Sequence, residues 1–574
     1  MLSRKRLIVL GFILLLALVV RIYKIDQAPA SLYYDEVDYG YQARSLIETH
    51  KDYRGELSPF YVHSFNDIRA PIPAYLTLFT TLLFKDPYFQ VRMPLVISGV
   101  IVVLFVFLLV NLWTKNFWMS VIVALVFSIN PWQIQFSRFS HEAVVMMLFY
   151  LAGLFSFYKS LQTKKFSYLF LSTILFSLTV YTYRTMSLFT PVTALVLFLI
   201  YREEIWQFGL TKLVLAVITG AVIVIPFLYA TTIGAPDVPR INQLSITSDQ
   251  AVPVWVQRNR EVDSGDYENQ TLGKKAVWYS YFFHNKPLSW LGALAKNYYD
   301  SFSTQFLFTK GDPNPRHSAG KLGELFYIDI IGFIFGLIFL YRNFKQKVFK
   351  WLTFWLLFSP LPAAITIDGS MHAARLFIFS APLLITVGLG WWFLFSSLRK
   401  TGFGRVVMLP LITVWLLLFI FYLHRYFVHF PLESAKYHGY GFKQMTEMVS
   451  KLEKNYKSIY LVSTNDPPMI YYLFWSDISP KYLQEYGTNF SQELVLNKKL
   501  DKVKVINWDK VIKDKNNVAE SLDPRILYVV TTTEVNSSSN GDMPEGVKEI
   551  GVVKYPSGEI AFRLITKDPN YKLK

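Results

Sequence analysis

The sequence predicts an all-α polytopic membrane domain of about eleven transmembrane helices with amphipathic outer-loop helices, followed by a C-terminal soluble α/β domain. The first observation is composition, because 52% of the 574 residues are hydrophobic and 17% are aromatic. A soluble core of this length could not bury so much apolar surface, and aromatic residues gather at membrane interfaces. The second observation is a series of long apolar runs, and the third is their replacement by mixed sequence in the C-terminal part.

The apolar runs approach the length needed to cross a bilayer, whose hydrocarbon core takes roughly 20 residues of helix. The shorter runs need interfacial flanks to complete a crossing. We therefore assign residues 1–425 to the transmembrane domain. The runs cover approximately Leu7–Tyr23, Met93–Trp113, Phe117–Pro131, Ala143–Tyr158, Phe166–Thr182, Met186–Tyr201, Leu213–Ala230, Tyr327–Tyr341, Phe349–Ile367, Leu376–Ser396 and Val406–Leu423.

Basic residues between the runs predict the orientation, because cytoplasmic loops are enriched in Lys and Arg. With a cytoplasmic N-terminus, the outer loops are 24–92 and 231–326, and the C-terminal domain is extracytoplasmic. We expect a multi-pass protein of a prokaryotic plasma membrane. The basic inside segments are Arg4-Lys5-Arg6, Lys115, Lys159 with Lys164-Lys165, Arg202 with Lys212, Arg342 through Lys350, and Arg399-Lys400 with Arg405.

The first run has a competing interpretation as a cleavable signal peptide, since Arg4-Lys5-Arg6 precede it and Ala28-Pro29-Ala30 follow it. The small residues lie well beyond Val20, with Arg21 and Lys24 in between. We therefore favour an uncleaved span.

Residues 431–574 have the pattern of a soluble α/β domain. The spacing of apolar residues predicts a helix over Gly441–Asn455. Runs rich in β-branched residues predict strands over Ser458–Val462, Val503–Trp508, Ile526–Thr532 and Ile560–Ile565. No catalytic constellation is evident in this domain.

Two function classes are excluded by composition. The sequence contains no Cys, which removes disulfides, thiolate metal sites and cysteine nucleophiles. The formal net charge of +17 could suggest nucleic-acid binding, but the Lys and Arg residues lie between apolar runs as topology signals. We expect a lipid bilayer, and no nucleic acid, as partner.

Three arginines lie at outer span edges, against the topology rule, and are candidates for binding a lipid phosphate. They are Arg375 in Asp368-Gly-Ser-Met-His-Ala-Ala-Arg375, Arg184 in Tyr181-Thr-Tyr-Arg184, and Arg138 after Ser137. A guanidinium binds phosphate oxygens bidentately and keeps its charge when partly desolvated. The alternative is a side chain that reaches the interface. Because Arg375 begins a helix, where a cation is unfavourable, we expect an anion near it.

Two histidines join this candidate phosphate-binding set. His372 lies beside Arg375, and His317 lies in a loop rich in Gly and Pro before the eighth run. His372 also has the alternative of an interfacial position. No ligand spacing specifies a metal site, so no metal or other cofactor is assigned, and a divalent cation is left open.

Three carboxylates on the same side are candidates for catalysis: Asp35, Glu36 and Glu142. Asp35 has a structural alternative, because it would be the N-cap of a helix over Glu36–Thr49. Glu142 could instead only stabilise a helix N-terminus. A second amphipathic helix over Pro73–Phe84 is too short to span and is expected along the interface.

At these residues the chain resembles the C-type (polytopic membrane) glycosyltransferase superfamily, in particular its protein O-mannosyltransferase and aminoarabinose-transferase group. The matching features are Tyr34-Asp35-Glu36, Arg69-Ala-Pro71, Val91-Arg92-Met-Pro94, and Ser137-Arg138 followed by Glu142. The resemblance implies that Asp35 acts in catalysis, with Glu36 as a lesser candidate and Glu142 as a second-loop acid. It also implies that Arg375 contacts lipid phosphate, and some relatives use a divalent cation.

The implied reaction moves a sugar from a polyprenyl-phosphate donor to an acceptor hydroxyl on the outer face. Asp35 would be the base and Arg375 the principal phosphate clamp, with inversion at the anomeric carbon. The acceptor, whether protein, lipid or glycan, is not defined by the sequence. One alternative is a transporter or flippase of a lipid-linked sugar, which the near absence of charge within the spans disfavours. The other is an envelope glycan polymerase or ligase, which remains open.

Overall fold

The chain forms two compact units in a computed structural model. Unit 1 comprises Met1–Leu14, Ile101–Gln133 and Met146–Phe419, and unit 2 comprises Leu15–Val100, Ile134–Val145 and Ile420–Lys574. This division differs from the domain boundaries expected at 425 and 431, which stay a prediction. The structure describes residues 3–58, 60–64, 68–232, 244–265, 276–319, 322–464, 466–488, 495–496, 502–512, 517–532, 534 and 543–571.

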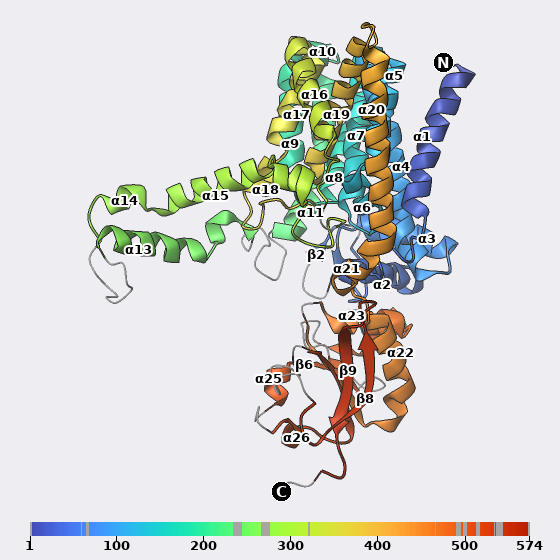
Figure 1. Cartoon of the computed structure of the whole chain (residues 1–574), viewed down its shortest axis with the longest axis vertical. Coiled ribbons are helices and arrows are strands. Elements are labelled where there is room, and N and C mark those ends of the chain that lie inside the picture. Colours follow the sequence, from blue (N-terminus) through green and yellow to red (C-terminus); the bar gives the residue numbers. More distant parts are fainter. Residues whose placement is uncertain are drawn as a thin grey trace. The chain divides into compact units, whose positions relative to one another are not determined.

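Helices occupy each of the expected apolar runs, and most of the described chain is helical (Figure 1). These helices are α1 (Arg4–Ile22), α4 (Pro87–Thr114), α5 (Phe117–Ile129), α7 (Ala143–Thr163), α8 (Phe166–Val180), α9 (Met186–Ile200), α11 (Leu210–Thr232), α16 (Asp329–Asn343), α17 (Lys347–Phe358), α19 (Phe377–Leu398) and α20 (Gly404–His424).

Within the described residues, five helices are long and apolar enough to cross a membrane alone: α4, α7, α11, α19, and α20 with its continuation to His438. A sixth crossing results if α5 and α6 (Pro131–Arg138), which are bent by 55°, form one span. The chain is thus a multi-pass membrane protein, while the expected count of eleven spans is not confirmed.

Helix length explains much of this difference. α8, α9 and α16 have 15 residues each, or about 22 Å at the α-helical rise, against a hydrocarbon core of about 30 Å. The ninth run was expected to be continuous, but α17 ends at Phe358 and a short helix, α18 (Leu361–Ala364), follows. Pro360 and Pro362 lie at this break, and proline cannot donate the backbone hydrogen bond that would continue α17.

Glycines set the closest helix packing in unit 1, between α16 and α19. A Cβ atom on Gly390 would lie 1.8 Å from the carbonyl oxygen of Gly332 and 2.4 Å from the backbone nitrogen of Gly336. A Cβ on Gly336 would lie 2.1 Å from the carbonyl oxygen of Thr386. Small residues at such spacing allow membrane helices to approach closely.

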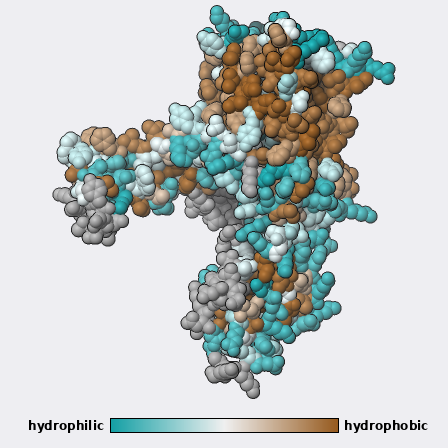
Figure 2. All heavy atoms as spheres, viewed as in Figure 1, coloured by the Kyte–Doolittle hydropathy of each residue, from teal (hydrophilic) through white to brown (hydrophobic). Residues whose placement is uncertain are grey.

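The outer surface of the unit 1 helices is apolar, as a membrane solvent requires. Figure 2 shows brown, hydrophobic side chains over these helices. α19 is mostly buried, because 89% of its most apolar 18-residue stretch lies inside the protein. In α11 only 11% of the corresponding stretch is buried. α19 is therefore the central helix, and it packs against α5, α16 and α17.

A helical arm also belongs to unit 1 and comes from the segment between α11 and α16 (Figure 1). It contains α13 (Ala251–Asp263), α14 (Ser280–Phe283) and α15 (Lys286–Asp300), and α15 packs against α18. The Asn297 side chain anchors it by donating to the carbonyl oxygens of Ala364 and Thr366, at 3.1 and 2.9 Å. Large exposed apolar residues along the arm include Trp255, Trp278, Phe282, Phe283 and Tyr299.

Unit 2 contains the two amphipathic helices that lie between α1 and α4 in the sequence. α2 (Tyr34–Thr49) packs against α3 (Ile72–Leu83), and between them lies a small antiparallel pair, β1 (Val62–His63) and β2 (Ile68–Arg69). Both helices confirm the two predicted amphipathic segments to within about two residues at their ends.

The C-terminal part of unit 2 contains a seven-stranded sheet among its described residues, in the order β4-β5-β6-β3-β7-β9-β8. The central β3 pairs in parallel with β6 and β7, and the outer pairs are antiparallel. The strands are β3 (Ser458–Val462), β4 (Gly487–Thr488), β5 (Val495–Leu496), β6 (Val503–Ile506), β7 (Ile526–Thr531), β8 (Val547–Lys554) and β9 (Ile560–Lys567).

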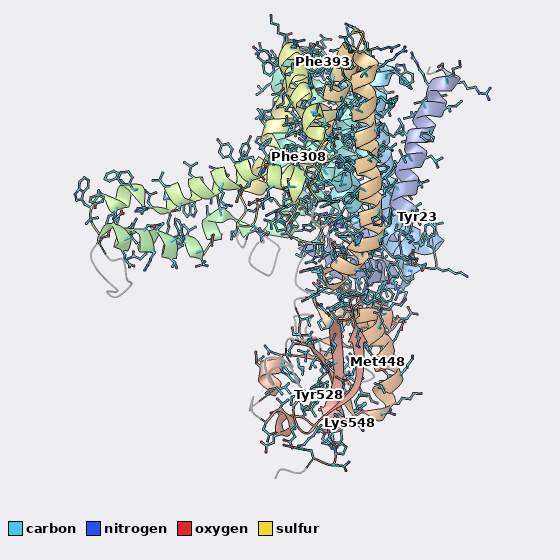
Figure 3. The ribbon with its side chains drawn as sticks, viewed as in Figure 1. Tyr23, Phe308, Phe393, Met448, Tyr528 and Lys548 are labelled. Atoms are coloured by element: carbon cyan, nitrogen blue, oxygen red, sulfur yellow. The ribbon has the colours of Figure 1, made fainter. Side chains whose placement is uncertain are left out.

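Alternating side chains bury both faces of this sheet. Leu461 belongs to one core, with α22 (Phe442–Leu452) and α23 (Pro468–Trp475), whereas Val462 belongs to the other, with α25 (Trp508–Val511) and α26 (Val518–Ser521). Met448 packs against the first core and Tyr528 lies in the second (Figure 3). The helix α22 confirms the predicted segment 441–455.

The first core also contains residues of α2, so the sheet region positions this helix. Val37 and Tyr41 of α2 belong to that core. A Cβ on Gly40 would lie 2.6 Å from the Phe474 ring, so α2 approaches α23 closely. The remaining short elements are α10 (Arg202–Trp206), η1 (Ile246–Ser248), η2 (Gln305–Thr309), η3 (Arg425–His429), α21 (Phe430–Ser434), η4 (Ala435–His438), η5 (Glu453–Asn455) and α24 (Pro480–Tyr486).

Candidate functional site

The start of α2 differs from the sequence expectation at Asp35. The N-cap residue is Tyr33, and Asp35 lies inside the first helical turn. The Glu36 side chain performs the cap interaction, because its Oε2 accepts a hydrogen bond from the Tyr33 backbone nitrogen at 3.0 Å. The capping alternative for Asp35 was therefore wrong, and its carboxylate is free of that role.

Asp35 instead forms an ion pair with Arg69 of β2. The Arg69 Nη2 atom lies 2.5 Å from Asp35 Oδ1, and the side chains are 14% and 31% exposed, respectively. The guanidinium also lies 5.1 Å from the centre of the Tyr34 ring. Arg69 of β2 thus fixes the position of a partly exposed carboxylate.

Asp38 lies one helical turn after Asp35 and is fully buried. Its Oδ1 atom accepts hydrogen bonds from Tyr53 at 2.9 Å and Ser64 at 3.2 Å, and its Oδ2 lies 3.6 Å from Arg69 Nε. Burial raises the pKa of Asp38 to about 6, against the lowering effect of Arg69. Arg69 therefore contacts two carboxylates, the partly exposed one of Asp35 and the buried one of Asp38.

Glu142 lies directly before α7 and is half-buried. The Tyr39 hydroxyl donates to its Oε2 atom at 3.5 Å, the outer limit of a hydrogen bond. The Tyr39 ring is also 5.7 Å from the Arg69 guanidinium. Burial, followed by the charge of Glu142, raises the pKa of Tyr39 well above its usual value. We call Asp35, Arg69, Tyr39 and Glu142 the carboxylate site; all four belong to unit 2.

Glu36 is fully buried in an ion pair with Arg92, whose Nε lies 2.7 Å from Glu36 Oε1. The other Arg92 donors bind Glu36 Oε2 and the backbone carbonyls of Ile25, Pro29 and Ser31. This geometry gives Glu36 a structural role, leaving Asp35 and Glu142 as the accessible carboxylates of the three.

Arg138 is also fully buried and lies in the last turn of α6. Its guanidinium donates to the carbonyl oxygens of Val20, Arg21, Lys24 and Ala28, with distances from 2.7 to 3.2 Å. These bonds use all five N–H donors of the side chain. Contrary to the sequence expectation, Arg138 therefore has no donor available for a phosphate and holds the α1–α2 connection in place.

In unit 1, Arg375 has the anionic partner that its position before α19 required. Asp368 forms a bidentate ion pair with it, and Arg375 Nη1 also donates to Thr366 Oγ1 at 2.6 Å. The Asp368 side chain is 58% exposed. An exposed carboxylate is a replaceable partner, so another anion could take its place on the guanidinium.

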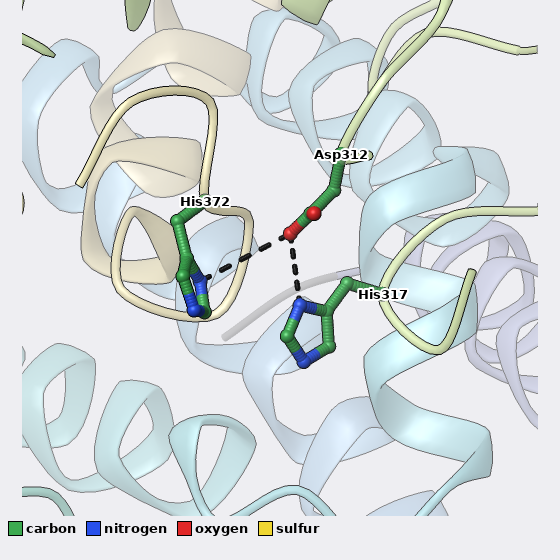
Figure 4. Close-up of side chains that lie close together, drawn as sticks. All are labelled: Asp312, His317 and His372. Atoms are coloured by element: carbon green, nitrogen blue, oxygen red, sulfur yellow. Dashed lines mark hydrogen bonds and ion pairs between the residues drawn. The ribbon is translucent and has the colours of Figure 1, made fainter. Parts of the chain in front are cut away.

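The histidines named from the sequence meet at a residue that the sequence did not single out (Figure 4). Asp312 Oδ2 lies 2.8 Å from His317 Nδ1 and 4.0 Å from His372 Nδ1. Burial, followed by the nearby His317, lowers the pKa of His372 to about 4. Among the described residues, Asp312, His317 and His372 form the one group with the donor atoms and separations to hold a metal ion.

Arg184 is placed in the turn between α8 and α9 and is partly buried. Arg184 belongs to unit 1 and the carboxylate site to unit 2, so its expected contact with a lipid phosphate stays a prediction. The sequence analysis assigned no site role to three residues of these clusters, Arg69, Tyr39 and Asp312. Only Arg69 had a visible signal, its position in Arg69-Ala-Pro71 directly before an amphipathic helix.

One family model matches part of the chain. Residues 68–229 match the family described as dolichyl-phosphate-mannose-protein mannosyltransferase. This segment contains Arg69, Arg92, Arg138 and Glu142, and it begins after Asp35. No curated protein matches the chain in sequence.

Solved structures share the fold over nearly the whole chain. The oligosaccharyltransferase AglB of Archaeoglobus fulgidus, in complex with an inhibitory peptide and a dolichol-phosphate, is 14% identical with a TM-score of 0.54, covering 100% of this chain and 75% of AglB. ArnT of Cupriavidus metallidurans, bound to undecaprenyl phosphate, is 11% identical with a TM-score of 0.53, covering 99% of each chain.

The family model matches residues 68–229, less than half of the chain, and the two solved structures share its fold. The chain is thus similar in fold, and over this segment in sequence, to membrane glycosyltransferases, in agreement with the resemblance carried by its sequence motifs.

Proposed function

We propose that the chain transfers a sugar from a polyprenyl-phosphate donor to an acceptor hydroxyl on the outer face of a prokaryotic plasma membrane, with inversion of the anomeric configuration. The observation that carries this proposal is the carboxylate site. Asp35 is partly exposed and fixed by Arg69, and Glu142 lies nearby through Tyr39. A pre-positioned carboxylate is the group that deprotonation of a hydroxyl requires.

Asp35 is the proposed base. The acceptor oxygen bonds to the anomeric carbon while the bond from that carbon to the phosphate oxygen breaks. The lipid phosphate leaves with the electron pair, and Asp35 accepts the hydroxyl proton. Attack opposite the leaving group inverts the anomeric centre. Arg69 lies 2.5 Å from Asp35 and holds its carboxylate in place. The catalytic contribution of this carboxylate therefore comes mainly from its fixed position relative to the acceptor hydroxyl.

Arg375 is the proposed clamp for the phosphate. Its guanidinium already forms a bidentate pair with the exposed carboxylate of Asp368. The donor phosphate is a diester whose two free oxygens share one negative charge, as in a carboxylate, and further charge develops on it as the sugar leaves, so it can bind the same pair of guanidinium donors. The proposed exchange replaces Asp368 by the donor phosphate. His317 and His372 retain their proposed place beside this phosphate-binding loop.

The donor class is supported by the related proteins. The matched family is described by dolichyl-phosphate-mannose, and the two solved structures contain dolichol-phosphate and undecaprenyl phosphate. All three are polyprenyl phosphates or their sugar esters. The AglB complex also contains an inhibitory peptide, which supports the inclusion of peptides among the acceptors to be tested.

The outer-face location is proposed from the basic inside loops. The chain has no Cys, so single cysteines can be introduced without background. Cysteines at positions 115 and 345 should resist an impermeant reagent added outside intact cells. A cysteine at position 56 of the first outer loop should react. Labelling of 115 or 345 from outside would contradict this topology.

Purified chain in lipid nanodiscs with a panel of polyprenyl-phosphate sugars and hydroxyl acceptors tests the reaction itself. The expected result is release of polyprenyl phosphate together with an inverted glycosidic product. Movement of the lipid-linked sugar across a vesicle membrane without bond cleavage would instead support the flippase alternative.

A further inference from the structure

Two loops of unit 1 bring one carboxylate and two imidazoles together (Figure 4). Asp312 and His317 lie between η2 and α16, and His372 lies between α18 and α19. One ligand atom from each residue lies within 4.8 Å of the other two. The three side chains come from distant parts of the sequence, so their convergence is a property of the fold.

The separations suit a tetrahedral metal ion. Bonds of about 2.0–2.1 Å to nitrogen and oxygen place neighbouring ligand atoms about 3.4 Å apart around such an ion. The Asp312 Oδ2 atom lies 2.8 Å from His317 Nδ1 and 4.0 Å from His372 Nδ1, values that bracket this spacing. The two imidazole rings are 5.0 Å apart between centroids and tilted by 37°. Small rotations of the rings would therefore complete the arrangement.

The surrounding backbone fixes Asp312. Its Oδ1 atom accepts a hydrogen bond from the Asn314 nitrogen and its Oδ2 accepts one from the Ala373 nitrogen, both at 2.7 Å. The second bond joins the two loops. Gly311 has a φ of +73°, and a Cβ there would lie 2.6 Å from the Leu322 carbonyl oxygen, so the loop around Asp312 is tightly closed. Second contacts of this kind orient metal ligands.

The solvent exposure of the three side chains differs. The Asp312 side chain is 4% exposed, whereas those of His317 and His372 are 11% and 21% exposed. The two imidazoles are therefore more accessible to solvent than the carboxylate. An ion bound there would have three protein ligands and a fourth position accessible to a small molecule.

We propose that Asp312, His317 and His372 form a binding site for one divalent transition-metal ion, with zinc as the expected ion and an open fourth coordination position. Two imidazoles with one carboxylate suit zinc and its neighbours, whereas Mg²⁺ and Ca²⁺ prefer oxygen ligands. Bound metal would join the two loops and so stabilise the loop that carries Arg375. The simpler alternative is an Asp–His hydrogen-bonded cluster that binds no metal.

Metal binding by the full-length chain, purified with a tag that contains no histidine, tests this proposal. The protein is treated with a chelator and titrated with Zn²⁺, and with Co²⁺ as a spectroscopic probe. The expected result is one ion per chain and visible Co²⁺ absorption of the intensity typical of low coordination number. Both readouts are independent of glycosyl transfer.

Matched variants identify the ligands. Asp312→Asn and His372→Gln should each weaken Zn²⁺ binding by at least about tenfold. His284→Gln is the control, because His284 Nε2 pairs with Asp263 Oδ2 at 3.2 Å in the same unit without joining the three-residue group. If Asp312→Asn does not fold, His372→Gln decides the question, since His372 is the more exposed ligand.

Two outcomes would overturn the proposal. One is a wild-type chain that binds no Zn²⁺ in the micromolar range, and the other is equal affinity in wild type and in His372→Gln. Either result would leave a hydrogen-bonded cluster only.

Discussion

Arg69 is held 2.5 Å from Asp35, and the same guanidinium lies 3.6 Å from the buried Asp38. One cation therefore serves two carboxylates of α2, the first partly exposed and the second enclosed. The exposed one is available to a substrate, while the enclosed one keeps Arg69 in place. Arg69 is accordingly a positioning residue for Asp35.

Replacement of Arg69 tests this relationship. Arg69→Ala should lower kcat by roughly a hundredfold, because a displacement of about 1 Å of a catalytic group has such an effect. The KM for the lipid donor should change little. Arg69→Lys should recover part of kcat, since it keeps the charge and loses the planar fork. A rise in donor KM at unchanged kcat would show that Arg69 binds the donor instead.

Substitutions of Asp368 and of Arg375 should have opposite effects on donor binding. Arg375→Ala should raise the KM for the polyprenyl-phosphate sugar at least tenfold, and Arg375→Lys should recover part of the affinity. Asp368→Asn should lower the same KM, because the guanidinium no longer has a competing carboxylate. Arg405→Ala, at an exposed arginine of α20, is the control and should leave it unchanged. Equal KM values across these variants would remove Arg375 from phosphate binding.

The raised pKa of Asp38 predicts that the stability of the protein depends on pH. Burial raises its pKa to about 6 in the folded protein, above the ordinary value of about 3.9 for aspartate. A raised pKa means that the folded state prefers the protonated form, so this stability is fully present below about pH 4 and is lost as pH rises through 6. The loss is roughly 3 kcal/mol for a shift of this size.

Thermal unfolding of detergent-solubilised protein between pH 4 and pH 8 measures this effect. Asp38→Asn should flatten the decline, because an amide does not ionise and can still accept the hydrogen bonds from Tyr53 and Ser64. Asp86→Asn, at an exposed carboxylate that caps the start of α4, is the control. An Asp38→Asn profile parallel to wild type would contradict the prediction.

The close contact at Gly390 predicts that a larger side chain there destabilises the packing of α16 against α19. Gly390→Ala would place a methyl group within 1.8 Å of the Gly332 carbonyl oxygen, so α16 and α19 must separate. Overpacking of this kind costs about 1–3 kcal/mol or more. Gly11→Ala in α1 is the matched control, because nothing lies within 4 Å of its added Cβ. A thermal midpoint of Gly390→Ala equal to that of Gly11→Ala would refute the close contact.

The sequence predicted those elements whose local pattern is strong. β3 agrees with the predicted strand residue for residue, because its alternating apolar side chains face two separate cores. The helix α23 was missed, because Pro468–Trp475 is apolar all round and almost entirely buried, so it has no polar face to reveal a period. The break after Phe358 was missed because the apolar run continues through it.

The site was predictable only where chain position itself carries information. Asp35 was found because it follows the first apolar run, and Arg375 because it opposes the topology rule. The partners that define their chemistry, Arg69 and Asp368, depend on how the chain folds back. The sequence suggested that Arg138 binds a substrate. In the structure all its donors bind backbone carbonyls, and these contacts depend on the tertiary fold.

The most direct test of the account is the activity of Asp35→Asn with a polyprenyl-phosphate sugar that the wild-type chain uses. Asn has the same shape and does not act as a base, and Asp35 does not cap α2. The account predicts a folded protein with a wild-type elution profile and a transfer rate lower by about a hundredfold to ten-thousandfold, whereas Asp86→Asn stays active. Retention of most activity by Asp35→Asn, together with a loss in Glu142→Gln, would contradict the account and assign the base to Glu142.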